Sequence, residues 1–232
     1  MRRLAFAAAV LLASLACTPR ATLPDAERQR VSQEIEGRAR YLRVACYVAP
    51  FFGDRSMVLL SSEPLSELDL VETADGRPVA PPPADRVLPP GTPVRIASIE
   101  FPTPWLIARR VMMTPRYHPW ALLEVPGDTR AHVVVLSQTA ATFDEVRAEL
   151  ERVLTPDDPR PVFDALPPEQ RDAIRKKELV EGMGPRALEM AWGQPDRKQI
   201  DRPAATEAWS WTDGKRRAFL QDDRLVRWEG GR

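Results

Sequence analysis

The chain has 232 residues with 33 basic and 33 acidic side chains, so its formal net charge is zero. That balance leaves no basic footprint for nucleic acid, and we expect no nucleic-acid partner. The 24 prolines outnumber the 11 glycines, which favours stiff connections and short strands over long helices. The length is typical of one or two domains.

The first seventeen residues have the layout of a secretory signal. Arg2 and Arg3 form a basic start, and residues 4–16 are apolar except for Ser14. The run is shorter than the roughly 20 apolar residues that a membrane-spanning helix needs. Cys17 follows directly after Ser-Leu-Ala. This segment resembles a bacterial lipoprotein signal, in which the cysteine becomes the lipidated first residue of the mature protein.

The resemblance implies a signal peptide over residues 1–16 and a lipidation site at Cys17. Ordinary secretion with cleavage near Ala16 is the alternative, and an uncleaved anchor is a weaker one. Thr18 stands where enterobacterial lipoproteins of the inner membrane carry Asp. The resemblance therefore favours a lipid anchor on the periplasmic face of the outer membrane over the inner membrane.

Polar residues without a clear apolar face occupy residues 17–38, and we expect them to be a tether. Residues 39–155 alternate between short apolar runs and turn residues, which predicts a β-rich domain with a terminal helix. We expect this domain to form a small sandwich or barrel. The predicted strands cover residues 41–48, 57–61, 68–72, 94–101, 105–113, 120–125 and 131–136.

The clearest helix pattern spans residues 142–154. Thr142 and Glu145 have the spacing of a capping box, and Phe143, Val146 and Leu150 fall on one helical face. The proline-rich residues 156–167 follow and predict a linker at a domain boundary.

Residues 168–232 predict two short helices followed by three or four antiparallel strands. Pro185 suits the first position of the second helix, and Gly193 suits its C-terminal cap. Asp213 and Gly214 predict a hairpin turn. The expected fold class is therefore α+β, with a β-rich central domain and a helix followed by a small ααβββ domain.

Several segments of this C-terminal region share one family pattern. They are Val180-Glu-Gly-Met183, Leu188, Trp192-Gly-Gln-Pro195, Trp209-Ser-Trp211 and Asp213-Gly214. This pattern resembles the SmpA/OmlA family, whose best-known members are small outer-membrane lipoproteins of the β-barrel assembly machinery. The resemblance implies an ααβββ domain. Two departures are Gly184, where the family has a small hydroxyl residue, and Asp222-Asp223, where Asn-Gly or Asp-Gly is usual.

Tryptophans are concentrated in the same region. Trp209 and Trp211 alternate on one predicted strand, so both side chains point to the same face. One interpretation is that they fill the core of a small domain. The other is that Trp209, Trp211 and Trp228 form an exposed aromatic surface for a protein partner.

Motifs for catalysis and metal binding are missing from the sequence. His118 and His132 are the only histidines, and neither has the spacing of zinc ligands. There is no nucleophile elbow, phosphate-binding loop or dinucleotide fingerprint. Cys46 lies in an apolar stretch, which predicts a buried and inert thiol. We expect no catalytic residue, no metal and no cofactor, and a protein that is not an enzyme.

These features predict a lipid-anchored cell-envelope protein that acts as a binding or scaffold module in outer-membrane protein assembly or envelope maintenance. The expected partners are a membrane, through lipid at Cys17, and an envelope protein. The main alternative is a peptidoglycan-binding module that uses the β-rich domain. A periplasmic hydrolase without a recognisable motif is the lower alternative.

Overall fold

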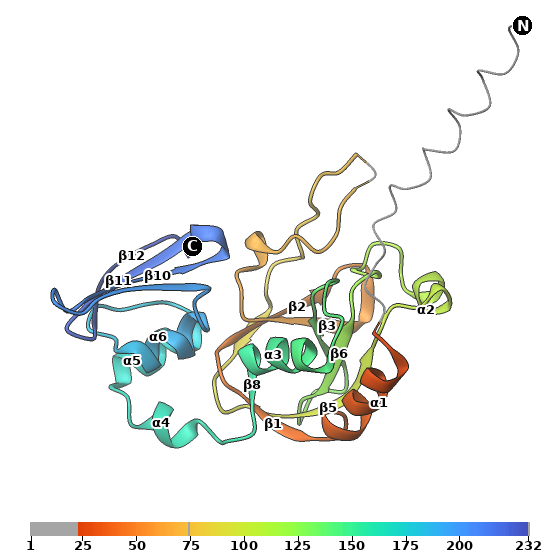
Figure 1. The fold of residues 1–232 in the computed structure, drawn as a ribbon, viewed down its shortest axis with the longest axis horizontal. Helices are drawn as coiled ribbons and strands as arrows, with labels where there is room; N and C mark the ends of the chain where they lie inside the picture. Colours follow the sequence, from red (N-terminus) through yellow and green to blue (C-terminus); the bar gives the residue numbers. More distant parts are fainter. Residues whose placement is uncertain (1–22, 74, 232) are drawn as a thin grey trace, which may run out of the picture.

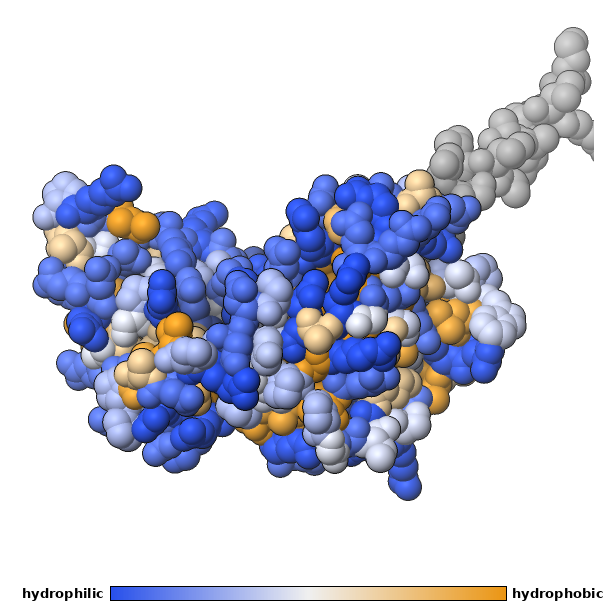
Figure 2. Space-filling view, turned by 90° about the horizontal axis from the view of Figure 1, so that it is seen from below, coloured by the Kyte–Doolittle hydropathy of each residue, from blue (hydrophilic) through white to orange (hydrophobic). Residues whose placement is uncertain are grey.

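The computed structural model describes residues 23–73 and 75–231 (Figure 1). These residues form a mixed α+β structure with an eight-stranded mixed sheet, a four-stranded antiparallel sheet and six α-helices. Figure 2 shows the two sheet units as two lobes with a notch between them. Cys17 lies outside the described residues. Across the part of the chain that is described, no helix combines the length and apolar character that crossing a membrane demands.

The larger sheet is open and has the strand order β4-β2-β3-β7-β6-β5-β1-β8. Its strands are β1 (Ala39–Leu42), β2 (Cys46–Phe51), β3 (Asp54–Ser61), β4 (Arg86–Leu88), β5 (Pro93–Glu100), β6 (Trp120–Glu124), β7 (Ala131–Val135) and β8 (Leu154–Thr155). β3 and β7 pair in parallel, and the other neighbours pair antiparallel. The edge strands β4 and β8 do not pair with each other, so the expected barrel is not formed.

Two of the expected strands are not strands. Residues 105–113 contain the helix α2 (Pro104–Arg109). Thr103 caps this helix, because its hydroxyl accepts a hydrogen bond from the Leu106 N–H at 3.2 Å, and Pro104 occupies the first turn. Residues 68–72 contribute only an isolated bridge between Glu72 and Pro78. Local capping by Thr-Pro therefore outweighs the apolar pattern that favoured a strand at 105–113.

Both faces of the large sheet are covered. α1 (Asp25–Glu34) and α3 (Phe143–Val153) pack with β5 and β6 over one core. The capping box of Thr142 and Glu145 is confirmed at the start of α3. On the other face, Phe51 and Trp120 pack edge to face, with ring centroids 4.9 Å apart. Leu65 and its neighbours in the long proline-rich connection cover this second cluster.

Residues 23–38, which we expected within the tether, are packed against the large sheet. Leu23 and Val31 are only 2% and 1% exposed. The Glu27 carboxylate accepts the Phe143 N–H at 2.7 Å, which ties α1 to the start of α3. The sequence showed few apolar residues here, but a few well-placed ones and a carboxylate on a helix N-terminus suffice for docking.

The C-terminal unit has the expected order of two helices and antiparallel strands, with four strands. Its elements are α5 (Pro168–Lys176), α6 (Pro185–Trp192), β9 (Arg197–Asp201), β10 (Thr206–Trp211), β11 (Arg216–Gln221) and β12 (Arg224–Glu229). The sheet order is β12-β11-β10-β9. Gly193 ends α6 with φ +87°, as its position predicted. Asp222 and Asp223 have φ 50° and 57°, so two aspartates make the left-handed turn that usually takes glycine.

The proline-rich residues 156–167 contain α4 (Arg160–Asp164), and Phe163 is buried in the core of the C-terminal unit. Buried polar contacts then join the two units. Lys177 Nζ donates to the carbonyls of Ala45 at 2.6 Å and Ala191 at 2.7 Å. Arg216 Nε lies 3.1 Å from a Glu67 carboxylate oxygen. The linker expected from composition is therefore a packed segment beside a buried junction.

Candidate functional site

The four-stranded sheet has one covered and one open face. α5 and α6 pack against one side (Figure 1). Trp209, Trp211 and Leu220 are buried on that side. Successive side chains of a strand point to opposite sides, so Ser210 and Phe219 lie on the other. No helix among the described residues covers that second side. We call it the open face, defined by Arg197, Gln199, Ala208, Ser210, Arg217 and Phe219.

The structure places the tryptophan candidates on the helix side of the sheet, although Trp209 also lines a hollow on the open face. Trp209 and Trp211 are 1% and 2% exposed, so a partner protein does not reach them. The Trp211 indole donates to the Gly193 carbonyl at 3.1 Å, and its ring meets Trp192 edge to face. Trp228 is 38% exposed and pairs with Ala218, so it belongs to the helix side of the edge strand β12. The core interpretation therefore holds for Trp209 and Trp211, and the three residues do not form the alternative, an exposed aromatic surface.

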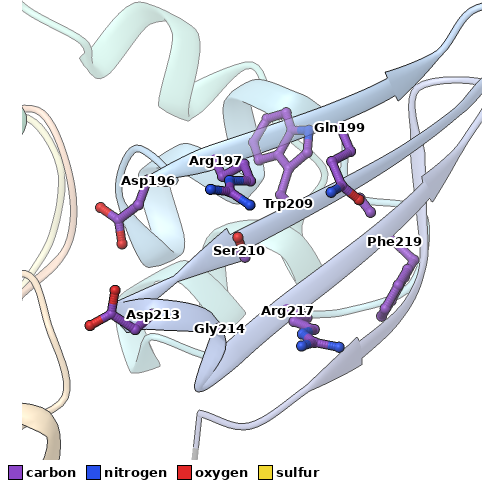
Figure 3. A pocket seen from close by; sticks show the side chains of 10 residues that line it. Asp196, Arg197, Gln199, Trp209, Ser210, Asp213, Gly214, Arg217 and Phe219 are labelled. Carbon is purple, nitrogen blue, oxygen red and sulfur yellow. The ribbon is translucent and has the colours of Figure 1, made fainter.

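A hollow of about 490 Å³ occupies the open face (Figure 3). Gln199, Ser210 and Arg217 reach it from three neighbouring strands, β9, β10 and β11. A second hollow of about 360 Å³ lies beside it and shares Gln199, Ala208 and Phe219. The two hollows make a continuous concave surface with an aromatic ring near its middle.

The hollow on the open face is lined by charges of both signs, with Arg197 and Arg217 on the strands and Asp196 and Asp213 toward one end (Figure 3). Arg197 and Arg217 form no ion pair within the described residues. Arg227 stacks 3.9 Å above the Phe219 ring and pairs with Glu229 at 2.7 Å. Asp196, at the end of the hollow, is held by Arg152 at 2.8 Å and so does not neutralise Arg217. Phe219 lies two residues along β11 from the unpaired Arg217 and under the Arg227 guanidinium, and this arrangement suits a protein partner with acidic side chains.

An unpaired strand edge borders this face. β9 ends the sheet order, and all five of its residues are exposed, including Ile200 at 55%. Such an edge offers backbone N–H and C=O groups to an added strand. The open face and the β9 edge together provide both side-chain and main-chain contacts to one partner.

The histidines do not build a reactive site. His132 is fully buried, and its Nε2 lies 3.7 Å from an Asp128 oxygen. Hydrogen bonds from Arg130 hold the pKa of Asp128 far below its ordinary value, and burial lowers the pKa of His132. His118 is tied to Leu136 and Gln138, at 2.9 and 2.8 Å. Within residues 23–73 and 75–231, no group of three His, Cys, Asp or Glu side chains is placed to hold a metal ion.

Cys46 is buried, as its apolar surroundings predicted. Burial raises the pKa of this thiol to about 12, so it stays protonated at neutral pH. Its Sγ donates toward the Val44 carbonyl at 3.4 Å. Cys46 is therefore a structural residue.

Comparisons with known proteins found no matching family model, curated protein or solved structure. The sequence pattern did not predict the open face, because the tryptophans were the only candidate contact residues in it. The signal for the open face is the set of residues that alternate with the buried ones: Ser210 separates the two indoles, and Arg217 and Phe219 flank the small Ala218. Alternation showed that these belong together, but not which side the helices cover.

Proposed function

We propose that this protein is a lipid-anchored cell-envelope protein that acts as a binding or scaffold module. Its contact surface is the open face, and its partner is an envelope protein. The observation that carries the proposal is an uncovered, concave sheet face lined by Phe219 and by Arg197 and Arg217, which form no ion pair among the described residues. No nucleophile with a histidine base lines this hollow. Its arrangement favours recognition over reaction.

The anchor is the second part of the proposal. Cys17 ends a segment with the layout of a lipoprotein signal, and Leu23, six residues later, is already packed in the core. Lipid at Cys17 would keep the folded part close to the membrane. We place the protein on the periplasmic face of the outer membrane.

The C-terminal unit is proposed to be an SmpA/OmlA-like domain. The order of α5, α6 and an antiparallel sheet supports this, and the additional strand β9 is a departure from ααβββ. On this proposal the protein serves outer-membrane protein assembly or envelope maintenance, with the tethered module holding a membrane-protein complex.

Peptidoglycan binding through the large-sheet unit is the second candidate. A groove of about 380 Å³ near α3 favours it, because Ser61, Glu63 and Glu149 line it with hydroxyl and carboxylate groups. Such groups can hydrogen-bond to sugar and peptide. Cosedimentation of the Glu149→Ala variant and the parent with purified peptidoglycan separates this candidate from the first.

Two variants test the main proposal. Arg217→Glu reverses the charge of the open face, and Arg186→Glu changes an exposed arginine elsewhere in the same unit as a control. We expect crosslinked envelope partners to be lost with Arg217→Glu and kept with Arg186→Glu. Equal recovery from both variants would contradict the open face as contact surface. Loss of metabolic acyl labelling in Cys17→Ser tests the anchor separately.

A further inference from the structure

Exposed apolar side chains gather around α2. Of the seven large hydrophobic residues that are exposed in the described structure, four belong to this segment. They are Trp105 (65% exposed), Val111 (41%), Met112 (74%) and Met113 (46%). A concentration of this kind on a soluble unit marks a surface for a partner or a membrane. We call these four residues the α2 patch.

The α2 patch stands on a firmly held base. The buried Arg110 donates to the carbonyls of Arg116 at 3.0 Å and His118 at 2.7 Å. Its guanidinium also stacks 3.5 Å from the Trp120 ring and pairs with Glu100 at 3.1 Å. These contacts of the buried Arg110 hold residues 110–118 in place, while the apolar side chains of the patch remain exposed.

The segment that carries the patch is basic in sequence. Residues 101–123 contain no aspartate or glutamate. Arg109 lies 4.3 Å above the Trp105 ring, and Arg116 contacts Met112 Sδ at 3.5 Å. Neither arginine forms an ion pair within the described residues. Tryptophan, methionine and unpaired arginine side by side are the composition of a surface that binds anionic lipid.

The patch lies at the same end of the molecule as α1, the first described helix (Figure 1). Glu27 of α1 binds the start of α3, and Gln138, just before α3, hydrogen-bonds His118 at 2.8 Å. The backbone carbonyl of His118 in turn accepts a hydrogen bond from Arg110, which underlies the patch. Figure 1 shows α1 and α2 on the same side, with the C-terminal unit at the opposite end. Six residues from Leu23 to Cys17 span at most about 20 Å.

We propose that the α2 patch rests in the surface of an anionic phospholipid membrane. Trp105 and Met112 insert at the boundary between headgroups and acyl chains, and Arg109 and Arg116 contact phosphates. This contact would act in addition to the proposed lipid anchor. The inference depends on that anchor only for where the membrane lies. The contact orients the protein, so that the open face on the far unit is held away from the bilayer.

The test uses the mature chain from residue 17 carrying Cys17→Ser, so that no lipid contributes to binding. Flotation with vesicles of equal parts phosphatidylglycerol and phosphatidylcholine measures partitioning. We expect Trp105→Ala/Met112→Ala to lower the partition coefficient at least about tenfold. The control Ile200→Ala/Val226→Ala removes residues of similar exposure, 55% and 48%, from the other unit and should change nothing. Arg109→Gln/Arg116→Gln should weaken binding about fivefold per arginine.

Two results would overturn the inference: no flotation of the parent chain at millimolar lipid, or equal flotation of the two double alanine variants. Matching thermal unfolding midpoints show that all variants are folded. Metabolic acyl labelling at Cys17 is a separate measurement that tests only the anchor. Without labelling, the anchor fails while vesicle binding still supports the α2 patch. With labelling but no flotation of Cys17→Ser, the anchor stands and the α2 patch is rejected.

Discussion

The two faces of the C-terminal sheet are built from the same strands, but one is buried under helices and the other is uncovered. On the helix side, Trp209 and Trp211 are buried and hold the unit together. On the open side, Ser210, Arg217 and Phe219 line a hollow. A small domain has little core volume, so its largest side chains are needed inside. The residues that alternate with the buried side chains, Ser210, Arg217 and Phe219, are therefore the better candidates for binding.

The helix side also extends into the junction with the large sheet. Arg216 projects from β11 on this side, where its guanidinium lies 5.2 Å from the Trp192 ring and pairs with Glu67. Lys177 at the end of α5 reaches across to Ala45. Changes on this side should thus reduce stability, and changes on the open face should reduce binding.

The largest effect is expected from Trp211→Ala. It removes a buried indole and leaves a cavity beside Trp192, so the free energy of unfolding should fall by about 3–5 kcal/mol. Urea unfolding followed by circular dichroism measures this. A loss below about 1 kcal/mol would mean that Trp211 is not a core residue.

Glu67→Ala should come next, with a loss of about 3 kcal/mol, because it leaves the buried Arg216 without its carboxylate. The double variant Glu67→Leu/Arg216→Met removes both charges and should recover most of that loss. Urea unfolding of the single and double variants makes the comparison. If the double variant is no more stable than the single one, an unpaired buried charge is not the cause.

The pH dependence of stability should report on Lys177. Burial lowers the pKa of Lys177 to about 7 from an ordinary value of 10.5. Between these values the unfolded chain binds more protons than the folded one, so the free energy of unfolding rises with pH. Cys46 opposes this rise above pH 9.0, its ordinary pKa, because its folded pKa is about 12.

The window from about pH 7 to 9 therefore isolates Lys177, and the expected rise there is about 2 kcal/mol. Urea unfolding at several pH values measures it. Lys177→Met should flatten the rise, whereas Lys198→Met, at an exposed lysine paired with Glu189, should keep it. A rise that survives in Lys177→Met would assign it to another group.

The smallest stability effect is expected on the open face. Phe219→Ala removes a half-buried ring from an uncovered surface, so it should cost about 1 kcal/mol or less. Partner crosslinking in cells should nevertheless be strongly reduced. Unfolding curves and crosslinking yields for the same variant check both halves of this prediction. A large loss of stability would place Phe219 with the core residues.

Local signals allowed part of this fold to be predicted. The α3 capping box, the Gly193 cap and the C-terminal hairpins each depend on residues a few positions apart. Long-range packing was out of reach. The docking of α1 depends on Glu27 meeting Phe143, 116 positions away. Whether β4 and β8 would close a barrel depends on pairing between distant segments.

For the candidate site, the sequence predicted which residues share a face of a strand but not which face is covered. Alternation grouped Trp209 with Trp211, but it gave no sign of which face α5 and α6 would cover. The sequence did not predict that Trp105 is exposed, because the apolar pattern of residues 105–113 predicts a strand. The helix forms there because Thr103 caps its N-terminus and Pro104 occupies its first turn.

The most direct test of the central claim places a photo-crosslinking amino acid at Gln199 on the open face and, as a control, at Arg147 on the exposed side of α3. Both side chains are accessible, and only the first borders the hollow. We predict that irradiation of living cells yields a discrete crosslinked envelope protein from position 199 and none from position 147. The same product from both positions, or none from position 199, would contradict the account.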